Sequence, residues 1–214
     1  MEPPENPTVL RLTVATYNIH GCIGMDRRYR PERVAAVIRE LGADVVALQE
    51  VDRRPRAGCP PLALEQLAGP AGYTAVAGPN FEEGGGDFGN ALLTAHPVLA
   101  VRRIDLSVPG RQPRGALDVD LEVGGELVRV IVTHHGLGGD RERRVQVARL
   151  LEALEARPAG RVVLLGDFNE WHPYSRALGL LAARFGRSRA PATWPSVRPV
   201  LALDRIWAAP AGAL

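Results

Sequence analysis

The stretch Asp44-Val45-Val46-Ala47-Leu48-Gln49-Glu50 decides the fold. Its four central residues are all apolar, which leaves this predicted strand without a face suited to water. A strand of this kind is covered on both faces, so we expect layers on either side of its sheet. The glutamate that follows the apolar run is the first of several polar residues found at predicted strand ends.

On either side of this strand, short apolar strands alternate with helical segments. Pro31 opens a predicted helix whose apolar residues share one face, and Gly42 closes it. The residues Val123-Gly124-Gly125-Glu126 predict a hairpin turn. Mixed hairpins and helical crossovers favour a layered α/β sandwich over a purely parallel fold. The other predicted elements are strands over 10–18, 91–94, 98–106, 116–123, 127–133, 161–165 and 200–207, helices over 62–67, 140–157 and 174–185, and a flexible loop over 82–89.

Length and composition describe an ordinary globular chain with one unusual feature. The 214 residues suit a single domain, and the formal net charge is only +2. All 26 basic residues are arginine, because the sequence contains no lysine. Schiff-base, pyridoxal-phosphate and P-loop chemistries each need a lysine amine and are therefore excluded.

The ends of the chain and its cysteines suggest a cellular setting. Residues 1–8 are polar and proline-rich, and we expect a flexible segment there followed by one domain over 9–214. No apolar run resembles a signal peptide or a membrane span, which favours a cytoplasmic protein. Cys22 and Cys59 lack metal-site spacing and are interpreted as free thiols, with a single disulfide as the alternative.

Polar residues stand at the ends of most predicted strands. A carboxylate or amide is costly to bury, so such a residue usually meets water, a metal ion or a ligand. Each could instead be a helix cap or a turn former, an alternative with about even odds for Asn18 or Asp204 alone. Hard oxygen ligands of this kind suit Mg²⁺ or Mn²⁺ better than structural zinc. The set comprises Asn18, Glu50, Asn90, His134, Asp167, Asn169 and Asp204.

Six short motifs containing these residues, together with a seventh around Arg114, resemble those of the endonuclease/exonuclease/phosphatase superfamily, the deoxyribonuclease-I-like hydrolases. They occur in the family's order and extend from about Thr13 to Trp207. Each motif is weak alone, but seven in order at predicted strand ends make a strong signal. They are Thr16-Tyr17-Asn18-Ile19-His20, Leu48-Gln49-Glu50-Val51, Gly89-Asn90-Ala91-Leu92-Leu93, Pro113-Arg114-Gly115-Ala116-Leu117, Thr133-His134, Gly166-Asp167-Phe168-Asn169 and Leu203-Asp204-Arg205-Ile206.

The resemblance implies a four-layer α/β sandwich of two packed mixed sheets flanked by helices, with a phosphoric ester hydrolase site at one rim. Glu50 would be the main Mg²⁺ or Mn²⁺ ligand, with Asn18 beside it. Asp167 would orient or deprotonate the attacking water, and Asn169 would hold that water or a phosphate oxygen. His134 would bind the phosphate, with Asp204 fixing its ring, while Arg114 would contact phosphate and Asn90 would position its neighbours.

One departure from the family leaves a second function open. The family normally adds a strand carrying Ser-Asp-His followed by proline, and the sequence contains no such motif. The missing motif predicts either a shortened reading frame without its last strand or a homologue with reduced catalytic activity. The alternative function is therefore a non-catalytic module that binds phosphate or nucleic acid through arginines.

Several further properties stay open at this level. The substrate can be nucleic acid, a lipid headgroup or another small phosphoester, and the oligomeric state is undetermined. Trp171 follows the Asp167 motif closely and could line a pocket near the site, but packing against the next helix is the expected role. The remaining histidines are expected to be structural: His20, His96, His135 and His172.

Overall fold

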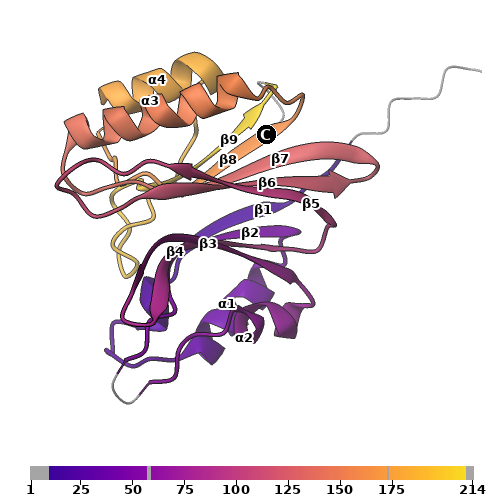
Figure 1. Ribbon diagram of the computed structural model, residues 1–214, viewed down its shortest axis with the longest axis vertical. Helices are drawn as coiled ribbons and strands as arrows, with labels where there is room; N and C mark the ends of the chain where they lie inside the picture. Colours follow the sequence, from indigo (N-terminus) through magenta and orange to yellow (C-terminus); the bar gives the residue numbers. More distant parts are fainter. Residues whose placement is uncertain (1–9, 57–58, 173, 211–214) are drawn as a thin grey trace, which may run out of the picture.

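The computed structural model describes residues 10–56, 59–172 and 174–210 as a stack of four layers. Two sheets face each other in the middle, with α1 and α2 outside one of them and α3 and α4 outside the other (Figure 1). This confirms the predicted four-layer α/β sandwich of two mixed sheets flanked by helices. The predicted flexible segment 1–8 lies outside the described residues.

The first sheet has the strand order β1-β2-β4-β3. Its parallel pair β1–β2 is joined through helix α1, which begins at Pro31 and ends before Gly42, as predicted. Gly42 has φ 56°, a left-handed conformation that glycine adopts without steric cost at a helix end. The elements are β1 (Val14–Asn18), α1 (Pro31–Leu41), β2 (Val45–Asp52), α2 (Leu64–Ala68), β3 (Thr74–Glu83) and β4 (Gly86–Thr94), with short 3-10 turns at His20–Cys22 and Gly69–Ala71.

The second sheet runs in simple order, β5-β6-β7-β8-β9. Its one parallel pair, β7–β8, is connected by the long helix α3. Gly166 allows these two strands to approach, since a Cβ atom at this position would lie 2.0 Å from the Thr133 carbonyl oxygen. The elements are β5 (Val98–Asp105), β6 (Gly115–Val123), β7 (Glu126–His134), α3 (Asp140–Ala156), β8 (Val162–Asp167), α4 (Arg176–Phe185) and β9 (Asp204–Ala209).

Three apolar cores fill the spaces between the four layers. The middle core joins the two sheets and includes Val45, Leu92 and Val130. The outer cores lie under the helices, around Ile38 on one side and Leu150 on the other. The run Val45–Leu48 is fully buried. Burial on both faces explains why that run contains no polar residue.

In the first half of the chain, one prediction was wrong and one strand was not predicted. The segment 82–89 is a β-hairpin rather than a flexible loop, because β3 and β4 pair up to Glu83 and Gly86 around the turn Gly84-Gly85. Strand β3 had no sequence prediction at all. Smaller differences concern strand ends, since 10–13 and most of 200–203 lie outside the regular strands.

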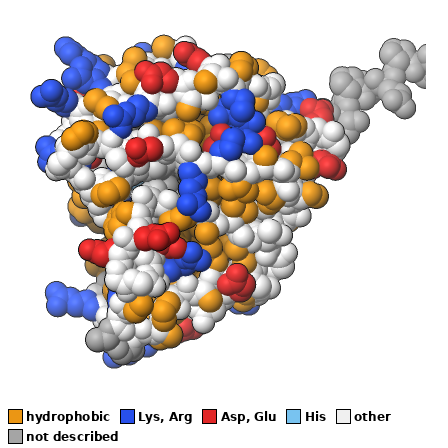
Figure 2. Space-filling view, viewed as in Figure 1, with side chains coloured by type: hydrophobic (Ala, Val, Ile, Leu, Met, Phe, Trp, Pro, Cys, Tyr) orange, Lys and Arg blue, Asp and Glu red, His pale blue; other side chains and the backbone are white. Residues whose placement is uncertain are grey.

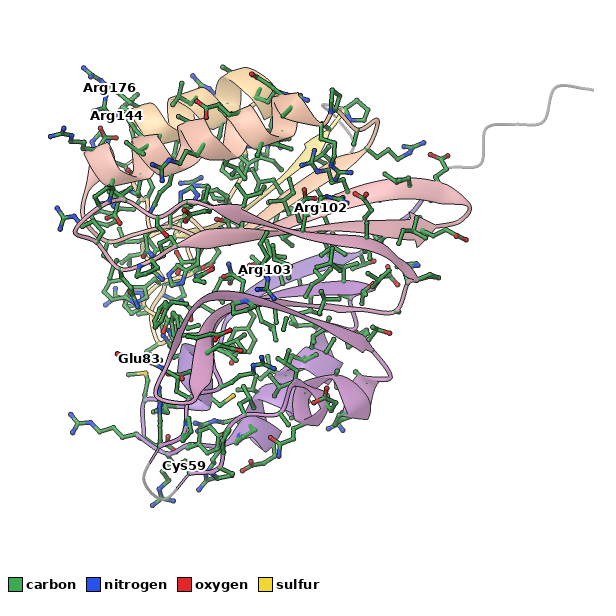
Figure 3. The ribbon with its side chains drawn as sticks, in the orientation of Figure 1. Cys59, Glu83, Arg102, Arg103, Arg144 and Arg176 are labelled. Carbon is green, nitrogen blue, oxygen red and sulfur yellow. The ribbon has the colours of Figure 1, made fainter. Side chains whose placement is uncertain are left out.

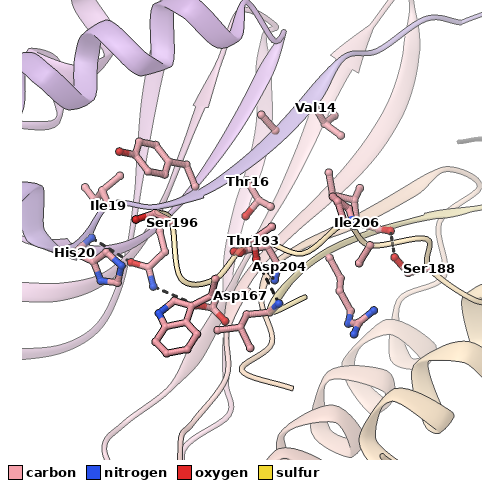
Figure 4. Close-up of a pocket in the computed structure, with 18 of the residues that line it drawn as sticks. Val14, Thr16, Ile19, His20, Asp167, Ser188, Thr193, Ser196, Asp204 and Ile206 are labelled. Carbon is pink, nitrogen blue, oxygen red and sulfur yellow. Dashed lines mark hydrogen bonds between the residues drawn. The ribbon is translucent and has the colours of Figure 1, made fainter. Parts of the chain in front are cut away.

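The outer edge of β1 has no neighbouring strand among the described residues. Thr13 O accepts a hydrogen bond from Val45 and Ile19 N donates one to Gln49, so by alternation the backbone groups of Val14, Thr16 and Asn18 point away from β2. They line a groove of about 1550 Å³ that β9 and the loop before it close on the other side (Figure 4). No helix in the described part of the chain is long and apolar enough to cross a membrane.

Candidate active site

The polar strand ends that the sequence singled out meet at one rim of the sandwich. His134, Asp167 and Asp204 are direct neighbours in register across β7, β8 and β9. Asn18 ends β1 in the opposite sheet, and Glu50 lies near the end of β2. The rim therefore collects side chains from both sheets, as we expect where strand ends converge.

A β-bulge aims Glu50 into this rim. The register between β2 and β4 shifts between Leu48 and Val51, so Gln49 and Glu50 together oppose Asn90. Glu50 has φ 54°, in the left-handed region that non-glycine residues rarely occupy. Strained backbone of this kind costs on the order of 1–3 kcal/mol and is concentrated at functional sites.

Asn18 connects the carboxylates of the two sheets. Its Nδ2 donates to Glu50 Oε1 at 2.9 Å and to Asp167 Oδ2 at 3.2 Å. Burial alone would raise the pKa of Glu50, but hydrogen bonds from His20 and Asn18 outweigh burial and lower that pKa to about 2. Glu50 is therefore an ionised carboxylate at neutral pH.

His20 belongs to the site, and the structural role predicted for it does not describe its position. Its Nδ1 lies 3.3 Å from Glu50 Oε2, and Figure 4 shows the ring among the residues that line the groove. The hydrogen bond to Glu50 raises the pKa of His20. The only available sequence signal was its place two residues after Asn18, which does not reveal that the turn brings the ring back to β2.

Hydrogen-bond donors surround the His134 ring. Arg114 Nη1 lies 3.3 Å from Nδ1, and Asn169 Nδ2 lies 3.0 Å from Nε2. Asn169 Nδ2 also donates to the His135 carbonyl at 2.8 Å, which fixes the orientation of its amide. Burial first, then the Arg114 cation, lowers the pKa of His134 to about 4, so the ring is neutral at pH 7.

A neutral imidazole has one acceptor nitrogen, so this cluster carries more donors than it can satisfy internally. Arg114 is only 4% exposed, and its buried Nε has no hydrogen-bond partner among the described residues. Unsatisfied buried donors are costly. An oxyanion placed against Arg114, His134 and Asn169 would satisfy them.

Hydrogen bonds fix the positions of Asn169 and of Asn90, which lies beside the cluster. Asn169 has φ 48°, and its backbone N–H donates to Asp167 Oδ1 at 2.9 Å. Asn90 is buried in β4 and donates to the Gly115 carbonyl at 3.0 Å, beside Arg114. Asn90 therefore links the two sheets at the residue after Arg114 and fixes the backbone there.

The structure does not pair Asp204 with His134, which corrects that part of the expectation. The His134 ring contacts Arg114 and Asn169, whereas Asp204 interacts with Thr193, a residue that the sequence had not marked. Burial, opposed by the Thr193 hydrogen bond and reinforced by the charge of Asp167, raises the pKa of Asp204 to about 6. Its Oδ1 is buried and has no hydrogen-bond partner in the part of the chain described.

A four-layer sandwich with carboxylates, amides and an imidazole at one rim defines a deoxyribonuclease-I-like protein. The chain belongs to the Endonuclease/Exonuclease/phosphatase family, whose sequence model matches residues 15–214. Members of this family are hydrolases that act on phosphoester bonds, and they generally use divalent metal ions.

Similar proteins cover most of the chain. The uncharacterized protein YbhP of Escherichia coli K12 is 31% identical over 224 residues, covering 95% of this chain and 87% of YbhP. An endonuclease/exonuclease/phosphatase structure from Beutenbergia cavernae superposes with a TM-score of 0.71 at 26% identity over 93% of this chain, which spans 64% of that structure. A mannosyl-6-phosphatase from Bacteroides thetaiotaomicron shares the fold, with a TM-score of 0.72 at 16% identity, covering 94% of this chain and 86% of its own.

Proposed function

We propose that this protein is a divalent-metal-dependent phosphoric ester hydrolase, a phosphodiesterase or phosphatase in which water attacks phosphorus directly. The observation that carries the proposal is the meeting of two opposite environments at one rim. Asn18 links the carboxylates of Glu50 and Asp167, and the donor-rich cluster around His134 lies beside them. One environment suits a cation and a water molecule, and the other suits a phosphate.

The donor set fits Mg²⁺ or Mn²⁺. No group of three or more His, Cys, Asp or Glu side chains in the described residues is arranged as a metal cage. Mg²⁺ does not need one, because it is commonly held by one or two carboxylates, with water and substrate phosphate completing its shell. Glu50 would hold the ion, with Asn18 beside it. When bound, the ion supplies Lewis-acid polarisation of the phosphoryl group.

The protein's own side chains would then act on water and phosphate. Asp167 orients the attacking water and accepts its proton, held in place by Asn18 and by the Asn169 backbone. Arg114 and His134 donate hydrogen bonds to the nonbridging oxygens, where charge develops in the transition state. Asn169 positions the water or a phosphate oxygen. No lysine is required, because the arginine fork binds phosphate through two parallel hydrogen bonds.

Two further residues act by positioning rather than by touching phosphate. Asn90 holds the backbone beside Arg114 in place. Asp204 borders the groove next to Asp167, where the charges of the two carboxylates act on each other.

Hydrolysis of bis(p-nitrophenyl) phosphate with Mn²⁺ tests the proposal. Asp167→Ala is expected to reduce the rate by about two to four orders of magnitude, the usual effect of removing a general base. Glu152→Ala, on the exposed side of α3, is the matched control and keeps the wild-type rate. Equal rates for wild type and Asp167→Ala would refute the site.

Calorimetric titration with Mn²⁺ tests the metal ligand without relying on turnover. Wild type is expected to bind the ion, and Glu50→Gln is expected to lose that binding, because an ionised carboxylate becomes a neutral amide. Steeply salt-dependent binding of nucleic acid without metal-dependent hydrolysis would instead support the non-catalytic module.

A further inference from the structure

The loop that follows Asn169 forms a second pocket, of about 390 Å³, between the N-terminal ends of α3 and α4. Trp171, His172 and Tyr174 line it, with Arg176 beside them. Trp171 is 51% exposed and Tyr174 is 87% exposed. Trp171 therefore lines a pocket beside the start of the following helix, and both aromatic rings offer surface to a ligand.

A buried ion pair fixes the backbone on both sides of Trp171. Glu170 and Arg143 are almost fully buried, and their side chains meet at 3.0 Å. Glu170 Oε1 accepts a hydrogen bond from the His172 backbone, and the Glu170 carbonyl accepts one from Arg205. The reaction proposed above makes no use of this pair. Buried ion pairs contribute little net stability, so we interpret this pair as holding the loop.

The charged side chains that line the pocket are Arg143, Arg176, Asp140 and Glu170. Glu170 pairs with Arg143 and Asp140 pairs with Arg144, so Arg176 is the one of these four without an ion-pair partner among the described residues. Arg176 at the start of α4 and Arg144 on the first turns of α3 extend from the same end of the molecule (Figure 3). Figure 2 shows arginine side chains gathered over that end. An acyl chain would require a continuous apolar patch. Exposed aromatic rings bordered by arginines instead suit a planar ring attached to an anionic group.

The pocket lies close to the phosphate-binding donors. Trp171 is two residues after Asn169, so their Cα atoms are at most about 7 Å apart. Asn169 in turn contacts the His134 ring. The loop is therefore close enough to the donor cluster to contact a group attached to a phosphate bound there.

We propose that this pocket binds an aromatic ring esterified to the phosphate, directly or through a sugar, with Trp171 as the stacking surface. The inference rests on the proposed function and narrows it to phosphoesters that carry a nucleobase or another aromatic group. Tyr174 and Arg176 border the bound ring. Stacking of one base on an aromatic side chain changes affinity by about tenfold.

Calorimetry in the presence of a chelator measures ring recognition without hydrolysis. Adenosine 5′-monophosphate and phenyl phosphate are the aromatic probes, and ribose 5-phosphate is the ring-free reference. Wild type is expected to bind at least one aromatic probe about tenfold more tightly than the reference. Preference for both aromatic probes indicates a general aromatic site, and preference for the nucleotide alone indicates a nucleobase site.

Variants at position 171 test whether Trp171 is the surface on which the aromatic ring stacks. Trp171→Ala is expected to lose the preference, and Trp171→Phe to keep part of it because an aromatic face remains. Leu41→Ala, exposed on α1 at the far side of the sandwich, is expected to behave as wild type. Equal binding of all probes by wild type, or an unchanged preference in Trp171→Ala, would overturn the inference.

The two proposals fail separately. A protein that hydrolyses esters with Mn²⁺ but shows no aromatic preference refutes the ring pocket alone. A protein that prefers aromatic probes but shows no metal-dependent hydrolysis refutes the proposed enzyme and still supports the pocket.

Discussion

Replacing Asp204 with asparagine is expected to stabilise the metal-free protein above about pH 6 and to have little effect near pH 4. Burial raises the pKa of Asp204 from 3.8 to about 6. The folded protein therefore holds the Asp204 proton more tightly than the unfolded chain does. It follows that the stability associated with this proton is fully present below about pH 3.8 and is lost as the pH rises through about 6.

The size of the effect follows from the pKa difference. Each pKa unit corresponds to about 1.4 kcal/mol, so a difference of about two units is worth about 3 kcal/mol. The side chain borders an open groove, where solvent screens part of this cost, so we expect about 2 kcal/mol. For a chain of this length, that change shifts the melting temperature by roughly 4–8 °C.

Thermal unfolding with a chelator, at about pH 4 and about pH 8, measures the effect. Asp204→Asn should melt higher than wild type only at the higher pH, because only there does wild type bury a charge that the variant lacks. Glu152→Gln on the exposed face of α3 removes a charge without removing a buried one and serves as the control. The same difference at both pH values, or a less stable variant at the higher pH, would refute the reasoning.

Three other substitutions test how the site is supported, and urea unfolding measures each. Arg143→Met leaves Glu170 buried without its partner and should lower the free energy of unfolding by about 3–5 kcal/mol. Adding Glu170→Leu should recover most of this loss, and equal stabilities of the single and double variants would contradict the ion pair. Gly166→Ala would place a methyl group 2.0 Å from the Thr133 carbonyl, so we expect a loss of about 2–4 kcal/mol; an unchanged midpoint would rule out that close approach. Asn90→Ala leaves the Gly115 carbonyl buried without its donor and should cost about 1–3 kcal/mol; a neutral result would mean that the two sheets do not depend on this contact.

The layered fold could be predicted because the sequence of a central strand shows that both its faces are buried. A run such as Val45–Leu48 tolerates no polar residue, since both its faces are buried. Strand β3 escaped prediction because it contains Gly78, Pro79 and Asn80, which usually break strands. These residues are tolerated because β3 is the outer strand of its sheet, where one side of the backbone needs no partner.

The members of the site could be predicted more easily than their partners. Polar residues that end apolar strands can be recognised from the sequence. The structure brings three of them, His134, Asp167 and Asp204, together as neighbours. Which side chain contacts which depends on local backbone geometry, such as the positive φ of Glu50. No residue pattern encodes that torsion, so the contact of His20 with Glu50 could not be anticipated.

The open edge of β1 has a consequence for how the protein behaves at high concentration. Its outward N–H and C=O groups, at Val14, Thr16 and Asn18, have no neighbouring strand among the described residues. Such an edge is a template for strand pairing, and because β9 and the loop before it close the groove on the other side, a pairing strand would have to enter that groove. Asn18 is also the residue that joins Glu50 to Asp167, so a strand from another molecule paired with this edge would lie directly beside the candidate site.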